Sequence, residues 1–135
     1  MSTLSNTDLT VTDVNCTNLI DASGNNGNTP AAINSGLVKA WVNMDGSGTA
    51  HVDTSFNITG IADNGTGVYT ITIATDFGSA DWVAAGMCGT DNTTTHIIGT
   101  GNVAPAAGTL KIQTVNDGGS AIDCPHIMVM MVGDQ

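Results

Sequence analysis

Glutamate and arginine are missing from this sequence, and lysine occurs only at Lys39 and Lys111. Long charged side chains normally cover the surface of helices, because they lose little conformational freedom there. Threonine, asparagine, glycine and aspartate take their place, and these residues favour strands, turns and left-handed corners. The composition therefore argues against a helical protein and for an all-β one.

Positive charge is scarce as well. All twelve acidic residues are aspartates and the formal net charge is −10, which argues against a nucleic-acid partner, since phosphate binding needs a basic surface. No apolar run reaches the roughly 18–20 residues of a membrane span. The start, Met1–Leu4, lacks the basic residues and apolar stretch of a signal peptide. We expect a chain that is made and folded in a cytoplasm and has no membrane partner.

Cysteine is too rare and too scattered for a disulfide framework. The three residues, Cys16, Cys88 and Cys124, form no Cys-x-x-Cys pair and no cluster with histidine. They are expected to be buried reduced thiols that behave as small hydrophobic residues. The hydrophobic fraction of 41% lies above that of a disordered chain, and 135 residues suffice for one domain plus a short arm.

Catalytic and metal-binding motifs are also missing. His51, His96 and His126 lie in separate segments, and no His-Glu-x-x-His, P-loop or Gly-x-Ser-x-Gly pattern occurs. The Asp-rich turns lack the spacing and the closing Glu of a calcium loop. Cys88 and His96 could be imagined as a nucleophile and its base, but nothing in the sequence orients them. We expect no enzymatic activity, no cofactor and no metal, although His126 could line an ion on a trimer axis.

The first 36 residues form a segment of their own. A five-residue echo runs from Thr7 to Asp21, and it is extended and amphipathic but too short to bury its apolar side. It is either an edge strand of the following domain or an arm that becomes ordered on another chain. We interpret residues 1–36 as an attachment and oligomerisation arm, and its apolar contact residues are Leu4, Leu9, Val11, Val14 and Leu19.

One short helix is predicted over residues 29–36. Thr29 is a suitable N-cap, Pro30 suits the first helical position, and Gly36 offers a left-handed end.

From residue 37 to 135, short strands alternate with turns, as in a sandwich or small barrel. The turns 45–48, 63–67 and 116–119 combine aspartate or asparagine with glycine. The expected strands are 37–44, 49–52, 55–61, 67–74, 81–88, 94–99, 109–115 and 124–132. This pattern predicts an antiparallel, jelly-roll-like β-sandwich knob of about eight strands.

Two strands have informative faces. In the fourth, Tyr69, Ile71 and Ile73 should point to the core, and the intervening threonines to solvent. The last strand is apolar on both faces, so either the knob's own loops or another subunit should cover its second face. We predict a trimer interface at Met128, Met130 and Val132. Both tryptophans, Trp41 and Trp82, are predicted to be core anchors.

Several segments resemble a family of virion structural proteins of marine bacteriophages, often described as tail-fibre-like and familiar from phages of cyanobacteria. The likeness lies in residues 39–49 (KAWVNMDGSGT), 55–61 (SFNITGI), 63–70 (DNGTGVYT) and 129–135 (VMMVGDQ), with a lead-in at 21–26 and 29–30. Relatives commonly have an aromatic residue where Met44 stands. The resemblance implies a β-sandwich knob on an extended arm, assembled as a homotrimer on the particle surface.

Two roles on such a particle are open. In the first, the protein is a capsid decoration, cement or short head fibre whose arm binds the major capsid protein. In the second, it is a tail-fibre tip, joined to a tail protein, whose loops bind a host surface glycan or protein. The candidate receptor residues are Asp91, Asn92, Thr93, Thr94 and Asn102. The short arm and the aromatic content of only 4% favour the first role.

Overall fold

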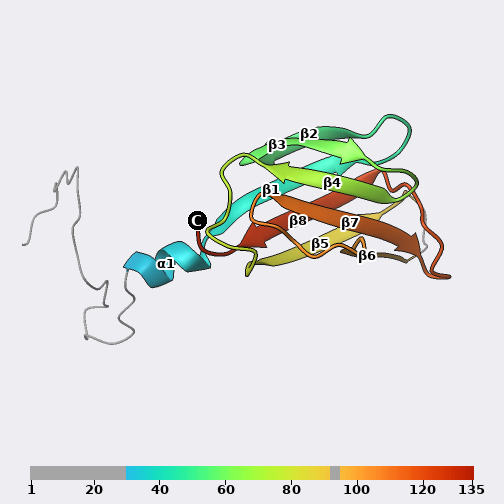
Figure 1. Ribbon diagram of the computed structural model, residues 1–135. Helices are drawn as coiled ribbons and strands as arrows, with labels where there is room; N and C mark the ends of the chain where they lie inside the picture. Colours follow the sequence, from blue (N-terminus) through green and yellow to red (C-terminus); the bar gives the residue numbers. More distant parts are fainter. Residues whose placement is uncertain (1–29, 92–94) are drawn as a thin grey trace, which may run out of the picture. The chain divides into compact units, whose positions relative to one another are not determined.

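The computed structural model describes residues 30–91 and 95–135 (Figure 1). Within these ranges it contains one helix, α1 (Pro30–Gly36), and eight strands. The strands are β1 (Val38–Asp45), β2 (His51–Phe56), β3 (Ile58–Asp63), β4 (Val68–Ile73), β5 (Val83–Gly89), β6 (His96–Thr100), β7 (Thr109–Asn116) and β8 (His126–Val132). Residues 34–135 form one compact unit. The predicted arm residues Leu4, Leu9, Val11, Val14 and Leu19 lie outside the described residues.

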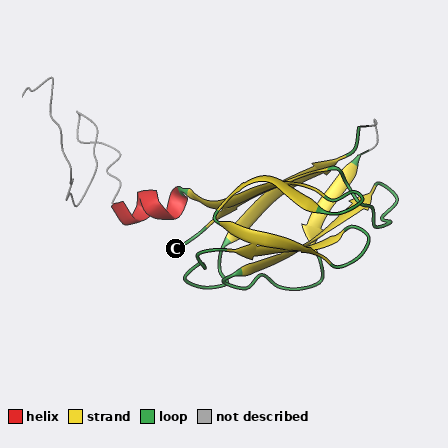
Figure 2. Ribbon diagram, turned by 90° about the horizontal axis from the view of Figure 1, so that it is seen from above, coloured by secondary structure: helices red, strands yellow, loops and turns green. Residues whose placement is uncertain are grey.

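The strands form two four-stranded antiparallel sheets that face each other (Figures 1 and 2). The first sheet has the order β2-β1-β8-β5, and the second has the order β3-β4-β7-β6. The chain changes sheets between β2 and β3, β4 and β5, β5 and β6, and β7 and β8. These repeated crossings give the jelly-roll-like sandwich that the sequence predicts, and the all-β fold is confirmed.

The core lies between the sheets and follows the alternation of the strands. On β4, Tyr69, Ile71 and Ile73 are buried, while Thr70 is half-buried and Thr72 exposed, which confirms the predicted pattern. The other strands contribute in the same way; their buried residues include Ala40, Val42, Met44, Leu110, Ile112, Ile127, Val129 and Met131. Each large apolar side chain buried in this way stabilises the fold by about 1.5–3 kcal/mol.

One buried polar group ties the core to two turns. The Tyr69 hydroxyl lies 2.9 Å from the carbonyl oxygen of Gly46 and 2.8 Å from Oδ1 of Asp123, so it has two acceptors within reach. The same carboxylate oxygen accepts a hydrogen bond of 2.6 Å from the backbone N–H of Gly67. Burial, and then the hydrogen bond to Asp123, raise the pKa of Tyr69. The hydroxyl therefore stays protonated and holds the ends of the two sheets together.

Two predicted strand boundaries are wrong, and Asn57 explains why. The strands expected at 49–52 and 55–61 are in fact β2 and β3, which separate at Asn57. This residue takes a left-handed φ of 56°, which asparagine tolerates better than most residues. Its side chain accepts a hydrogen bond from Thr75 N (2.8 Å) and donates to the carbonyl oxygen of Lys39 (3.0 Å). Asn57 thus ends one strand and directs the chain into the opposite sheet.

The helix α1 begins at Pro30, within the predicted range. Gly36 does not have the left-handed conformation that we expected at its end, because the positive-φ glycines of the described residues are Gly48, Gly65, Gly67 and Gly119. Instead, the N–H of Leu37 donates to the carbonyl oxygen of Asn34 at 3.3 Å and closes the last turn.

Candidate functional site

The outward side of the first sheet is an apolar surface, which we call the outer face. Residues that pair directly across antiparallel strands point to the same side, so the register defines its rows. The three rows are Phe56–Trp41–Met130–Ala85, then Thr54–Asn43–Met128–Met87, and finally Val38–Val132–Val83. The outer face thus spans all four strands of this sheet.

Its large side chains are open to solvent. The exposed fractions are 37% for Trp41, 54% for Phe56, 66% for Met87, 40% for Met128 and 49% for Met130. At the two ends of the third row, Val38 and Val83 are exposed as well. Between Trp41 and Met87 the surface is hollowed into an apolar depression of about 450 Å³, with Met128 and Met130 in its wall. Contiguous apolar surface of this kind usually marks an interaction site.

Trp41 lies outside the core, contrary to our prediction. We expected both tryptophans in the core, and Trp82 is there, 8% exposed and stacked on Phe77 with ring centroids 4.8 Å apart. In β1, however, the inward positions are Ala40, Val42 and Met44, so Trp41 points outward. The alternation of inward and outward positions in β1 determines the orientation of Trp41, and the size of its side chain does not.

The predicted interface residues all lie on the outer face. Met128 and Met130 are exposed and Val132 is half-buried, whereas Ile127, Val129 and Met131 of the same strand are buried. Within the described ranges no loop covers Met128 or Met130, so these residues leave the second face of β8 open. Sequence reasoning missed Trp41, Phe56, Val83 and Met87. The cross-strand register could have found them, but pairing partners are not visible in a single sequence.

No charged residue belongs to the three rows, although the chain has a net charge of −10. Ionisable residues occur in the next outward-facing row after the second. There Asp45 of β1 pairs with His51 of β2, and His126 of β8 pairs with Gly89 of β5. Together with Asp53 and Asp91, these residues form what we call the charged rim.

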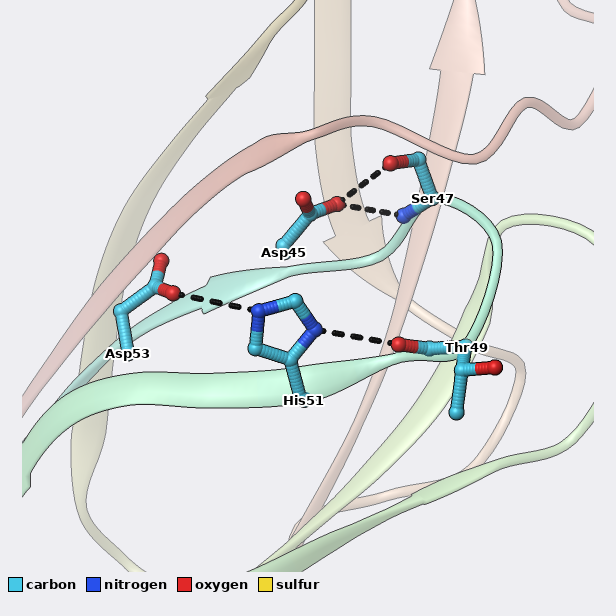
Figure 3. A network of polar contacts seen from close by, with 5 residues as sticks. All are labelled: Asp45, Ser47, Thr49, His51 and Asp53. Carbon is cyan, nitrogen blue, oxygen red and sulfur yellow. Dashed lines mark hydrogen bonds and ion pairs between the residues drawn. The ribbon is translucent and has the colours of Figure 1, made fainter.

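Hydrogen bonds and close His–Asp contacts hold the charged rim in place. Asp45 Oδ1 accepts from Ser47 Oγ at 2.6 Å and from Ser47 N at 2.7 Å (Figure 3). The hydroxyl bond, followed by the backbone bond, keeps the pKa of Asp45 below its ordinary value of 3.8. His51 Nε2 lies 3.4 Å from Asp53 Oδ1 and its Nδ1 lies 3.0 Å from the carbonyl oxygen of Thr49. The charge is thus fixed at one end of the outer face.

The predicted receptor residues are only partly described. Asn92, Thr93 and Thr94 lie outside the described residues. The exposed Asp91 contacts His126 Nε2 through Oδ1 at 2.8 Å and so belongs to the charged rim. Asn102 is exposed in the β6–β7 connection, with a left-handed φ of 57° and its N–H donating to Thr100 O at 2.9 Å. Asp91 therefore contacts a side chain of β8, whereas Asn102 contacts the backbone of β6.

Cys88 and His96, the pair considered as nucleophile and base, are both half-buried. Burial raises the pKa of the Cys88 thiol to about 11, so it remains protonated at neutral pH. The Nδ1 atom of His96 is buried and has no hydrogen-bond partner among the described residues. Across residues 30–91 and 95–135, no three His, Cys or Asp side chains are grouped to hold a metal ion. In the same ranges no helix has the length and apolarity to span a membrane.

Comparisons with known proteins add one structural likeness. No family model matches the sequence, and no curated protein matches it. Among solved structures, the fold is similar to the crystal structure of the phiAB6 tailspike in complex with three-repeated oligosaccharides of Acinetobacter baumannii surface polysaccharide. The identity is 14% and the TM-score is 0.49, over 99% of this chain and 31% of the tailspike chain.

Proposed function

We propose that this chain is a structural protein of a bacteriophage particle, without catalytic activity, displayed on the particle surface as a homotrimer. Its arm, residues 1–36, binds the major capsid protein or a tail protein, and its β-sandwich knob stands outward. As a capsid decoration, cement or short head fibre it is made in the host cytoplasm and joins the particle during assembly. Many weakly bound copies on a repeating lattice gain avidity without large individual interfaces.

The observation that carries the proposal is where the phage-like segments lie in the fold. Residues 39–49 form most of β1 and the turn after it, and 55–61 span the change of sheet at Asn57. Residues 63–70 form the turn into β4, and 129–135 complete β8. The resemblance thus falls on strands and turns that determine the sandwich, which supports a shared architecture. That the host is a marine bacterium stays a prediction.

The outer face supports a role in assembly. A chain with a net charge of −10 leaves three rows of one sheet face without a charged residue, and these rows are rich in exposed methionine and aromatic side chains. A protein that works alone gains nothing from such a surface, because it promotes association. The proposed role requires contacts between protein subunits, and the outer face suits that requirement.

The alternative is a tail-fibre tip that binds a host surface glycan or protein. Its support is the two exposed polar residues Asp91 and Asn102, which follow β5 and β6. Counting copies on the particle distinguishes the two roles. Cryo-electron microscopy of the intact phage should show the knob in hundreds of symmetry-related copies on the shell, whereas a few copies at the tail would favour the fibre tip.

The arm is tested by binding to particles stripped of this protein. The double variant Leu9→Asp/Val11→Asp places charge on the apolar positions of the arm, and we expect bound protein to fall on the order of tenfold. The matched control is Thr10→Asp/Thr12→Asp, which adds the same two charges at neighbouring polar positions and should bind as the unsubstituted chain does. Quantitative immunoblotting of sedimented particles measures both. If the double variant coats the particles as well as the control, the arm is not the attachment segment.

A further inference from the structure

We infer that copies of this chain meet through the outer face, the aromatic half of one copy packing on the methionine half of the next. The inference deepens the proposed function and rests on the self-assembly that it includes. It names the surface and the partner, which is a second copy of the same chain.

Charge selects this partner. Two copies of net charge −10 repel each other wherever aspartates approach, so they can only meet where both surfaces are uncharged. The three rows of the outer face supply such a surface. A basic protein would instead be drawn to the aspartates, and an anionic membrane would repel the charged rim. An identical copy is the partner whose surface this face matches.

Taken as a whole, the outer face exposes an apolar area close to what one partner buries in a standard interface. Seven large side chains of the outer face are 37–70% exposed in the described chain: Val38, Trp41, Phe56, Val83, Met87, Met128 and Met130. With aromatic side chains of roughly 150–250 Å² and smaller aliphatic ones, they present on the order of 600 Å². A standard interface buries about 800 Å² per partner. In a ring each copy covers one half of the outer face in each of two contacts, and the polar surroundings of the rows add area to each contact.

The two halves of the outer face differ in chemistry. Phe56 and Trp41 form the half on β2 and β1, and Met130, Met128 and Met87 lie on β8 and β5. The apolar depression between Trp41 and Met87 is open, and Phe56 stands at the far edge of the first row. Thioether sulfur packs favourably against aromatic rings. Contact between unlike halves suits a closed ring such as a trimer, in which each copy offers its aromatic half to one neighbour and its methionine half to the other.

Single charges placed on each half test the inference. In Phe56→Asp and Met87→Asp the introduced carboxylate would be buried without a partner, so the dissociation constant between copies should rise at least about tenfold for each. The control Thr72→Asp adds the same charge at an exposed position of the second sheet and should leave it unchanged. Met87→Leu keeps the apolar volume and should preserve association. Sedimentation velocity over a concentration series measures the four variants, and far-UV circular dichroism checks that each is folded.

The association experiment tests the inference independently of the proposal that the protein belongs to a phage particle. Loss of association in both Asp variants, with Thr72→Asp and Met87→Leu still associated, supports the inference even if no particle carries the protein. A monomeric unsubstituted chain overturns it, as does an oligomer that survives either Asp substitution. A particle that carries the knob as separated monomers would also overturn it, without touching the proposed place on the particle.

Discussion

At the scale of single residues, position along the strand outweighs side-chain type. Trp41 and Met130 are large and apolar, yet both are solvent-exposed, because they occupy outward positions of β1 and β8. Ala40 and Met131, one position away, are fully buried. Side-chain type alone predicts that a tryptophan in such a sequence lies in the core. The register is needed to show that it faces outward.

Cys88 yields a prediction on alkaline stability. Burial raises its pKa to about 11, from an ordinary thiol value of 9.0 in the unfolded chain. The folded state therefore binds the thiol proton more tightly than the unfolded state. Its contribution to stability is fully present below pH 9 and is lost as the pH rises through about 11.

We expect Cys88→Ala to lose less unfolding free energy between pH 8 and pH 10.5 than the unsubstituted chain. Urea unfolding followed by tryptophan fluorescence at both pH values measures the difference. Tyr69, whose pKa is also raised, titrates in both proteins and cancels in the comparison. An equal loss in the two proteins would show that the thiol is not shielded from water.

At the scale of elements, the sequence predicts strand boundaries well where a recognisable turn separates two strands. The Asp-Gly turn after β1 and the Asp-Asn-Gly turn before β4 place both strands within a residue or two. The alternation of β4 also predicts which side is buried. The boundary between β2 and β3 could not be predicted, because it depends on bonds from Asn57 to Lys39 and Thr75, each 18 residues away in the sequence.

The junction at Asn57 can be dissected with two substitutions. Asn57→Gly keeps the left-handed backbone easily accessible but removes the side-chain hydrogen bonds, and it should cost about 1–2 kcal/mol of unfolding free energy. Asn57→Ala removes the same bonds and also strains the backbone, so it should cost roughly 1 kcal/mol more. Thermal and urea unfolding measure both. If alanine proves no worse than glycine, the left-handed φ is not a determinant of the sheet change.

At the scale of the whole molecule, one sheet face closes the core and the other stays open. The inner faces of both sheets are packed, and the outer face of the first sheet is apolar without a cover among the described residues. The sequence pointed to this through the two-faced last strand, and it named Met128, Met130 and Val132. The rest of the surface comes from β1, β2 and β5, and only the sheet order β2-β1-β8-β5 brings these strands beside β8.

The molar mass of the full chain in solution tests the central claim most directly. Multi-angle light scattering on the eluting peak should give three times the chain mass of 13.6 kDa at micromolar concentrations. Association should strengthen from 0.05 to 0.5 M salt, because screening weakens the repulsion between acidic copies while apolar contact persists. A mass of 13.6 kDa at every concentration and salt level would contradict the account.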